Sequence, residues 1–433
     1  MVTSTDTAWR RIAPGVLLPS ALQAISYGAI LPITAVYAHD LGASLALAGL
    51  VAAFILVGQL LGNLPGGWAV DRFGERNAML VAAGLNIAAL AGCALSTRPE
   101  PLIACALLVG VANAVFGLAR QALVTIVIAP SFRARAFSLM IGASRLGLLV
   151  GPFIGAAAIS ATGSVRAGFV VGVVAILATI VSVLLIPDPE QIVGVPVTPA
   201  GAPRPKLLTT MRESRRVLWR VGFAATAVSA MRSSRSTLLP LWATSLGMDA
   251  PTIAVIVGVG SAIDFSLFYV GGMLMDRYGR WGVGVLTLVS YGVGHLVLAL
   301  TYGDAWAVQV FLAVVVAFAV TDGLCSGIIM TTGADMADMV NPNRPAVFLA
   351  AWRLVTDLGS AGAPLAISLL TGIASLAWAA AGIGLVGFGG AFVLGRFGAA
   401  IMREAAARRA GRDAAPVPAE PASRPRTQAD AVR

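Results

Sequence analysis

The chain has 433 residues, of which 58% are hydrophobic and only 12% charged, and its formal net charge is +10. Soluble domains carry about 25% charged residues, so this composition excludes a water-soluble protein of this length. Apolar runs long enough to cross a bilayer core of about 30 Å recur from end to end. The sequence therefore predicts an all-α integral membrane protein.

Twelve apolar runs follow one another along the chain. The first six predict helices over 12–37, 45–70, 77–96, 101–129, 136–161 and 165–186. The second six predict helices over 219–244, 250–275, 282–302, 305–333, 347–371 and 374–399. The breaks between the runs are short and rich in charge and turn-forming residues, so we expect two sets of six transmembrane helices.

Basic residues predict the orientation of these helices. Arginines fall on every second boundary, whereas the opposite boundaries hold only Arg98 and Arg166. Because basic loops stay on the cytoplasmic side, both termini are predicted to be cytoplasmic in a multi-pass protein of the cell membrane. The positive charge can attract anionic membrane lipids. Without a soluble basic domain to present that charge, we expect no nucleic-acid partner.

Four segments are predicted. Six-helix bundles cover residues 1–186 and 219–402. Residues 187–218 begin with a proline-rich stretch that cannot form a regular element and are predicted to be a cytoplasmic linker. The tail over 403–433 is rich in Ala, Pro and Arg and is predicted to be a disordered cytoplasmic segment.

A charged stretch framed by glycines is present twice. Residues 66–76 read GGWAVDRFGER, and residues 271–281 read GGMLMDRYGRW. Near an offset of 208 residues, Arg145 also falls on Arg353. These matches indicate that one six-helix unit has been duplicated, in the same orientation each time because six is even. Parallel repeats of this kind form secondary transporters, with the substrate site between the halves near the bilayer midplane.

At this point the sequence resembles the major facilitator superfamily, over roughly residues 10–400. GGWAVDRFGER lies between the second and third predicted helices and is similar to the loop signature of that superfamily. GLLVGPFIGA, residues 147–156, resembles the glycine–proline motif of its drug/proton antiporters. The resemblance implies twelve helices in two halves that rock to give alternating access, usually coupled to a proton.

The repeated loop motif is interpreted as a cytoplasmic latch that is made and broken as the halves rock. Asp71 lies at a helix–loop junction, where exposed backbone N–H groups favour a carboxylate. Gly67 is expected to permit close helix contact, and Gly74 a tight turn. A signal that only sets topology is the alternative. The predicted gating residues are Gly67, Asp71, Arg72, Gly74, Arg76, Gly272, Asp276, Arg277 and Gly279.

The glycine–proline motif on the fifth predicted helix has two interpretations. Gly147, Gly151, Pro152 and Gly155 form a small-residue face with a kink, which suits helix packing. A rough counterpart over 359–364 in the second half shows that packing alone could explain much of the motif. The resemblance adds antiport as the second interpretation.

Eight charges lie within the predicted helices. Each costs at least about 2.5–3.5 kcal/mol at mid-bilayer unless it is paired, hydrated or functional. We expect Arg353 to pair with Asp357, one turn away on the same helix. We expect Asp264 to pair with the two arginines of the seventh helix, which lie at its depth. The eight are Arg120, Arg145, Arg232, Arg235, Asp264, Asp322, Arg353 and Asp357.

Arg120 and Arg145 have no intramembrane acid in their own half. Unpaired positive charge in a low dielectric attracts an anion strongly, so we expect both residues to face the central cavity and to favour an acidic substrate. Contacts with backbone carbonyls and water are the alternative. The predicted substrate-binding residues are Arg120, Arg145, Arg232, Arg235, Tyr27 and Asn113.

Proton coupling needs a side chain that can gain and lose a proton, which arginine cannot do. The predicted proton-coupling residues are Asp264, Asp322 and Asp357. Asp357 has Arg353 nearby. Asp322 has no arginine evident from the sequence and is expected to be kept protonated by desolvation, unless a partner arrives from the eleventh helix. Asp264 is the predicted coupling site, because one of its two expected arginines could leave when substrate binds.

Three functions remain open. The resemblance implies a proton-linked exporter of amphipathic or drug-like compounds. The arginines favour a permease or exchanger for small organic anions, and a membrane-integral enzyme or sensor is the third reading. The first helix has no acid where drug antiporters often carry one, and Arg120-Gln121-Ala122 matches their fourth-helix motif imperfectly.

The sequence shows no metal-ligand cluster, nucleophile motif or phosphate loop. We therefore expect no metal, no cofactor and no enzyme activity. A small-molecule substrate, protons and membrane lipids are the expected partners of a monomer.

Overall fold

The computed structural model describes residues 3–128, 130–185, 211–212, 214–325, 327–340 and 345–413. Every regular element in these ranges is helical. The N-terminal half contains α1 (Thr3–Asp40), α2 (Leu45–Phe73), α3 (Glu75–Leu95), α4 (Pro99–Val127), α5 (Pro130–Thr162) and α6 (Arg166–Leu184).

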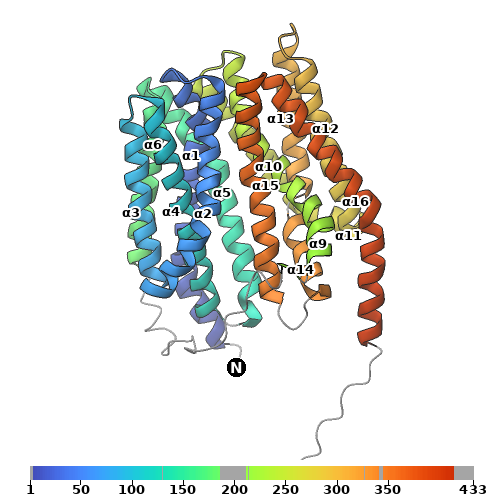
Figure 1. The fold of residues 1–433 in the computed structure, drawn as a ribbon. Coiled ribbons are helices and arrows are strands. Elements are labelled where there is room, and N and C mark those ends of the chain that lie inside the picture. The colour runs from blue at the N-terminus through green and yellow to red at the C-terminus, as the bar shows by residue number, and fades with distance from the viewer. Residues whose placement is uncertain are drawn as a thin grey trace, which may run out of the picture.

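The C-terminal half begins with a short helical turn and a π-helical segment. Its elements are α9 (Arg215–Val217), η1 (Leu218–Gly222), α10 (Phe223–Ser245), α11 (Ala250–Tyr278), α12 (Arg280–Leu300), α13 (Ala307–Cys325), α14 (Ile328–Val340), α15 (Pro345–Ile373) and α16 (Leu376–Asp413). Figure 1 shows the two halves side by side, with the start of α1 and the end of α16 at the same end of the molecule, called here the terminal end. The predicted fold, two bundles of membrane helices, is confirmed.

Eleven of these helices are long and apolar enough to cross a membrane. The remaining long helix, α10, has 23 residues and so extends about 35 Å. Its lower hydropathy comes from Arg232, Arg235 and several serines, some of which line the cavity described below. It packs against α15, α16 and α1 inside the bundle, so its polar residues avoid lipid.

Two predicted boundaries differ from the structure. The tenth predicted helix, 305–333, is broken: α13 ends at Cys325 and α14 begins at Ile328, with Gly327 at φ +91° between them. This left-handed backbone suits glycine and ends the first helix. The last helix continues to Asp413, past the predicted start of the tail at 403. The rest of the tail, and most of the predicted linker over 187–218, lie outside the described residues.

Close helix contacts repeat between the halves. A side chain at Gly151 of α5 would bring Cβ within 2.5 Å of the Ile25 carbonyl oxygen on α1. In the second half, a Cβ added at Gly359 of α15 would lie 2.3 Å from the Thr226 carbonyl oxygen on α10. Small residues let backbones approach this closely. The duplication read from the loop motif therefore extends to the packing of α1 on α5 and of α10 on α15.

Among the residues whose burial the structure describes, one apolar core is continuous across the halves, and it lies away from the terminal end. There, one cluster includes Val51 of α2 and Leu241 of α10. Toward the terminal end, one cluster holds N-terminal-half residues such as Phe116, and a separate one holds C-terminal-half residues such as Phe348 and Trp352. The halves thus share a core at one end and have separate cores at the other.

Candidate functional site

A cavity of about 640 Å³ lies between the two halves. Helices α1, α2, α4 and α5 line one wall, and α10, α11, α13, α14 and α15 line the other. Seven of the eight predicted intramembrane charges are on its surface: Arg120, Arg145, Arg232, Arg235, Asp264, Asp322 and Asp357. The cavity therefore concentrates charge at the place where parallel-repeat transporters bind substrate.

Two further predicted binding residues have different positions. Tyr27 of α1 lines the cavity. Asn113 of α4 is not among the lining residues, and its side-chain oxygen accepts hydrogen bonds from Gln23 and Asn86, both at 3.1 Å. Asn113 is therefore held inside the N-terminal bundle by two amides, and its role in substrate binding stays a prediction.

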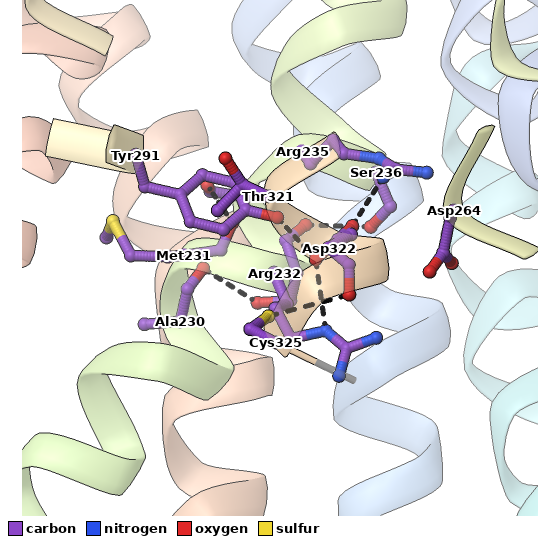
Figure 2. Close-up of polar contacts among 12 residues, drawn as sticks. Ala230, Met231, Arg232, Arg235, Ser236, Asp264, Tyr291, Thr321, Asp322 and Cys325 are labelled. Atoms are coloured by element: carbon purple, nitrogen blue, oxygen red, sulfur yellow. Dashed lines mark hydrogen bonds and ion pairs between the residues drawn. The ribbon is translucent and has the colours of Figure 1, made fainter. Parts of the chain in front are cut away.

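Asp322 of α13 is the centre of a buried polar cluster (Figure 2). Its side chain is 6% exposed, and one carboxylate oxygen lies 3.2 Å from Nε of Arg232. Arg235 forms a second ion pair with the carboxylate, and the hydroxyl of Tyr291 donates a hydrogen bond to it. One carboxylate is therefore shared by two arginines, close to the break between α13 and α14.

This cluster corrects two expectations. Arg232 and Arg235 were expected to pair with Asp264, and Asp322 was expected to have no arginine. Figure 2 shows both arginines reaching Asp322, with Asp264 to the side on another helix. The reason is packing: α10 lies mainly on α15 and α16 and touches its chain neighbour α11 only slightly. Equal depth in the membrane does not bring two side chains together.

Asp264 of α11 pairs instead with Arg145 of α5. The guanidinium nitrogen lies 3.3 Å from the carboxylate oxygen, and the two side chains are 17% and 19% exposed. The Arg145 guanidinium also lies over the ring of Phe268, at 4.3 Å from its centre, which adds a cation–π contact. Arg145 was expected to lack an acid; its acid comes from the other half, so this ion pair joins the two halves.

Arg353 and Asp357 of α15 form the expected pair within one helix, at 3.7 Å. Both also reach the N-terminal half. Arg353 donates to the side-chain oxygen of Gln121 on α4 at 3.4 Å, and Asn63 on α2 donates to Asp357 at 3.2 Å. This pair is therefore a second polar link between the halves.

Arg120 of α4 has a different environment from the other arginines. One of its terminal nitrogens donates to the Ser144 hydroxyl at 3.3 Å, and its buried Nε has no hydrogen-bond partner. Within the described ranges of the chain, no carboxylate contacts it. Arg120 is thus a cavity arginine without a counter-ion in this part of the structure.

The repeated loop motif lies at the terminal end. Asp71 and Arg72 are exposed in the last turn of α2, and Gly74, at φ +77°, joins α2 directly to α3. Arg76 donates to the carbonyl oxygen of Leu184 at the end of α6, at 2.9 Å. The copy has the same form, with exposed Asp276 and Arg277 before Gly279 at φ +78°.

One glycine of this motif does not do what was expected. A Cβ at Gly67, or at its counterpart Gly272, would meet nothing within 4 Å. The close contact belongs to Gly66, whose Cβ would come within 2.7 Å of Leu118 on α4, and to its counterpart Gly271. Successive residues of an α-helix point in directions about 100° apart. The two glycines of each pair therefore face different surroundings.

The glycine–proline motif of α5 packs on α1. Cβ atoms at Gly147, Gly151 and Gly155 would each approach an α1 carbonyl oxygen, at 2.3, 2.5 and 3.2 Å. Pro152 lies on the cavity surface. The motif therefore brings the backbone of α5 against α1 while its other face carries Arg145 to the cavity.

Several polar cavity residues were missed in the sequence. Gln59, Gln121 and Ser144 line the cavity, and Tyr291 and Asn63 hold two of the acids. Gln59 had a signal, because it falls on Asp264 at the offset of 205 residues. Uncharged polar residues are common in membrane helices, so the sequence did not distinguish the others. In the described residues, no group of three or more His, Cys, Asp and Glu could hold a metal ion.

The sequence is similar to a known protein family and to a curated relative. The family model of the Major Facilitator Superfamily matches residues 16–364. A "Na(+), Li(+), K(+)/H(+) antiporter" from Planococcus maritimus is 28% identical over 155 residues, which are 34% of this chain and 36% of the relative. The matched region thus spans about a third of that curated relative.

Solved structures share the fold. A POT family transporter in complex with a thioalcohol-conjugated peptide has a TM-score of 0.75 at 12% identity, covering 89% of this chain and 96% of that one. A D-xylose–proton symporter has a TM-score of 0.64 at 16% identity, covering 90% and 97%. At these identities the likeness concerns the arrangement of the helices.

Proposed function

Because this chain belongs to the Major Facilitator Superfamily, we propose that it exports a small amphipathic or drug-like compound across the cell membrane in exchange for protons. The observation that carries the proposal is the ion pair between Arg145 and Asp264, which joins the halves inside the cavity. In this proposal the protein works as a monomer, with both termini in the cytoplasm.

Alternating access is supported by the unequal cores. The halves share apolar packing away from the terminal end and have separate clusters toward it. In this proposal, with the termini in the cytoplasm, the cavity opens toward the cytoplasmic side. An exporter collects its substrate in such a state.

Proton exchange is supported by the position of Asp264. Asp322 keeps two arginines of its own half, and Asp357 keeps Arg353 of its own helix. Asp264 is paired instead with Arg145, an arginine of the opposite half. Rocking of the halves would carry Arg145 away, and a proton could then take the place of the arginine as the counter-charge of the carboxylate. Closing the pair again would expel that proton.

The cavity suits an amphipathic compound. Its volume of about 640 Å³ lies within the usual range for drug-sized ligands, about 300–1,000 Å³. Apolar side chains such as Leu31, Leu56, Leu148 and Phe265 share the lining with the charges. The curated relative is described as an antiporter that exchanges cations for protons, which is consistent with proton exchange here.

Purified protein in liposomes tests the proposal. Vesicles made acidic inside, with pyranine reporting the internal pH, are offered a cation, a neutral compound and an organic acid: ethidium, chloramphenicol and 2-naphthoate. We expect an acid interior to drive accumulation of at least one of the three, with matching loss of internal protons. Heat-inactivated protein is the control. Accumulation of none of them, or accumulation that ignores the gradient, would contradict proton-coupled export of drug-like compounds.

A further inference from the structure

The charges that line the cavity do not balance. Arg145 is matched by Asp264, and Asp357 is matched by Arg353. Asp322 supplies one negative charge to two arginines, and Arg120 contacts no acid in the described part of the chain. Among these groups, one positive charge in each half is therefore left without compensation.

Of these two uncompensated charges, Arg120 is the clearer, because no described residue around it takes the place of an anion. Its hydrogen-bond partner is the neutral hydroxyl of Ser144, and its buried Nε has no partner. Removing a guanidinium from water without an opposite charge is unfavourable. An arginine kept in this condition on the wall of a cavity gains most from a ligand that brings the missing charge.

We propose that Arg120 is the anchor for the acidic group of the transported compound, and that the substrate is an amphipathic organic acid. A carboxylate fits the planar fork of a guanidinium with two parallel hydrogen bonds, which a single-atom anion cannot form. Ser144 adds a hydroxyl beside this fork. Ile141 and Leu148, on the same helix as Ser144 and on the cavity surface, offer apolar contact to the rest of the molecule.

The proposal rests on the transport function only in calling the bound compound a substrate. Binding at Arg120 and proton exchange at Asp264 involve different side chains from different halves. An organic acid bound at Arg120 is also attracted by the excess charge of the Arg232 and Arg235 cluster on the opposite wall. Organic acids are therefore preferred over neutral analogues of the same shape.

A thiol on the cavity wall measures the charge at this position. The three cysteines, Cys93, Cys105 and Cys325, are replaced by alanine, and Ile141 is replaced by cysteine. Ile141 is 36% exposed, lines the cavity and lies one turn from Ser144. The rates of modification are measured with an anionic sulfonatoethyl methanethiosulfonate and with its cationic trimethylammonium analogue.

We expect Arg120→Gln to lower the ratio of the anionic rate to the cationic rate by about tenfold, since one nearby positive charge is removed. Arg120→Lys should keep the ratio within about twofold of the parent, because the charge is retained. Arg98→Gln, at the start of the same helix α4, is the matched control and should leave the ratio unchanged. An unchanged ratio in Arg120→Gln would overturn the proposal.

Protection of the same thiol tests the ligand class. Benzoate and 2-naphthoate are compared with benzamide and 2-naphthamide, and with chloride and sulfate. We expect the acids to slow modification several-fold, the amides and inorganic ions to have little effect, and Arg120→Gln to remove the protection. Equal protection by amides or by inorganic ions would overturn the proposal, as would no protection by either acid. Loss of proton-coupled transport with acid protection intact would contradict the proposed function alone.

Discussion

The two main interfaces between the halves are held in different ways. Helix α5 meets α11 through the ion pair of Arg145 with Asp264. Helix α2 meets α15 through neutral donors: Asn63 donates to Asp357, and the Ser368 hydroxyl donates to the Ala46 carbonyl oxygen at 2.6 Å. One interface thus depends on a titratable pair that spans the halves, and the other does not.

The repeat explains where this difference arises. Arg145 of α5 falls on Arg353 of α15, so both interfaces have an arginine at the same place. Asp264 of α11 falls on Gln59 of α2, so only one interface has the acid. Arg353 pairs with Asp357 on its own helix instead. We infer that duplication supplied a symmetric scaffold and that a single exchange between an acid and an amide gave one interface its ion pair across the halves.

A change at Asp322 should have the largest effect, and it separates a structural acid from a coupling acid. Asp322→Asn leaves two half-buried arginines without their buried carboxylate, and breaking a buried ion pair costs about 3–5 kcal/mol. We expect a large loss of folded protein, measured by size-exclusion chromatography in detergent and by thermal unfolding. Asp276→Asn, exposed in the last turn of α11, is the control. Normal yield and thermal stability would show that the cluster around Asp322 is not needed for folding.

Asp264→Asn should remove the ion pair from the interface of α5 with α11. The amide can still accept a hydrogen bond from Arg145, so folding should be near normal, but it cannot exchange a proton. We expect transport driven by a pH gradient to fall at least about tenfold while counterflow, which needs no gradient, persists. Asp249→Asn, exposed at the start of the same helix, is the matched control. A mutant that still concentrates substrate would place coupling elsewhere.

Asp71→Asn tests the two copies of the loop motif. If the motif is a latch, transport should fall several-fold at near-normal expression, because Asp71, which has an interaction partner in this structure, loses its charge. Asp276→Asn should be milder, since Arg280 occupies the position that Glu75 has in the first copy. Initial rates in proteoliposomes, normalised to reconstituted protein, measure both. Wild-type turnover in Asp71→Asn would leave only a topological role.

Asn63→Ala should have the smallest effect, and it tests the interface of α2 with α15, which is held by neutral donors. It removes one hydrogen bond to Asp357, which is worth about 1 kcal/mol, and leaves the pair with Arg353. We expect a small drop in thermal stability, a less than threefold change in transport, and no change in the pH profile. A shifted pH profile would show that the interface of α2 with α15 also takes part in coupling.

Much of this protein could be predicted from its sequence. Apolar runs of helical length have few alternatives in a chain so poor in charge. The stretch around Asp71, repeated around Asp276, indicated the duplication and with it a cavity between the halves. Charges such as Arg120 and Asp264, isolated in apolar runs, marked the residues that line this cavity because lipid does not tolerate them.

The pairing of those charges was decided by the tertiary structure. Arg145 finds Asp264 across the molecule, and Asp322 holds Arg232 and Arg235, because helices that are distant in sequence pack together while α10 and α11 barely touch. Depth in the membrane follows from counting residues along one helix. The direction in which a side chain points, and the helix it meets, depend on rotations and crossings of helices that only the packed bundle defines.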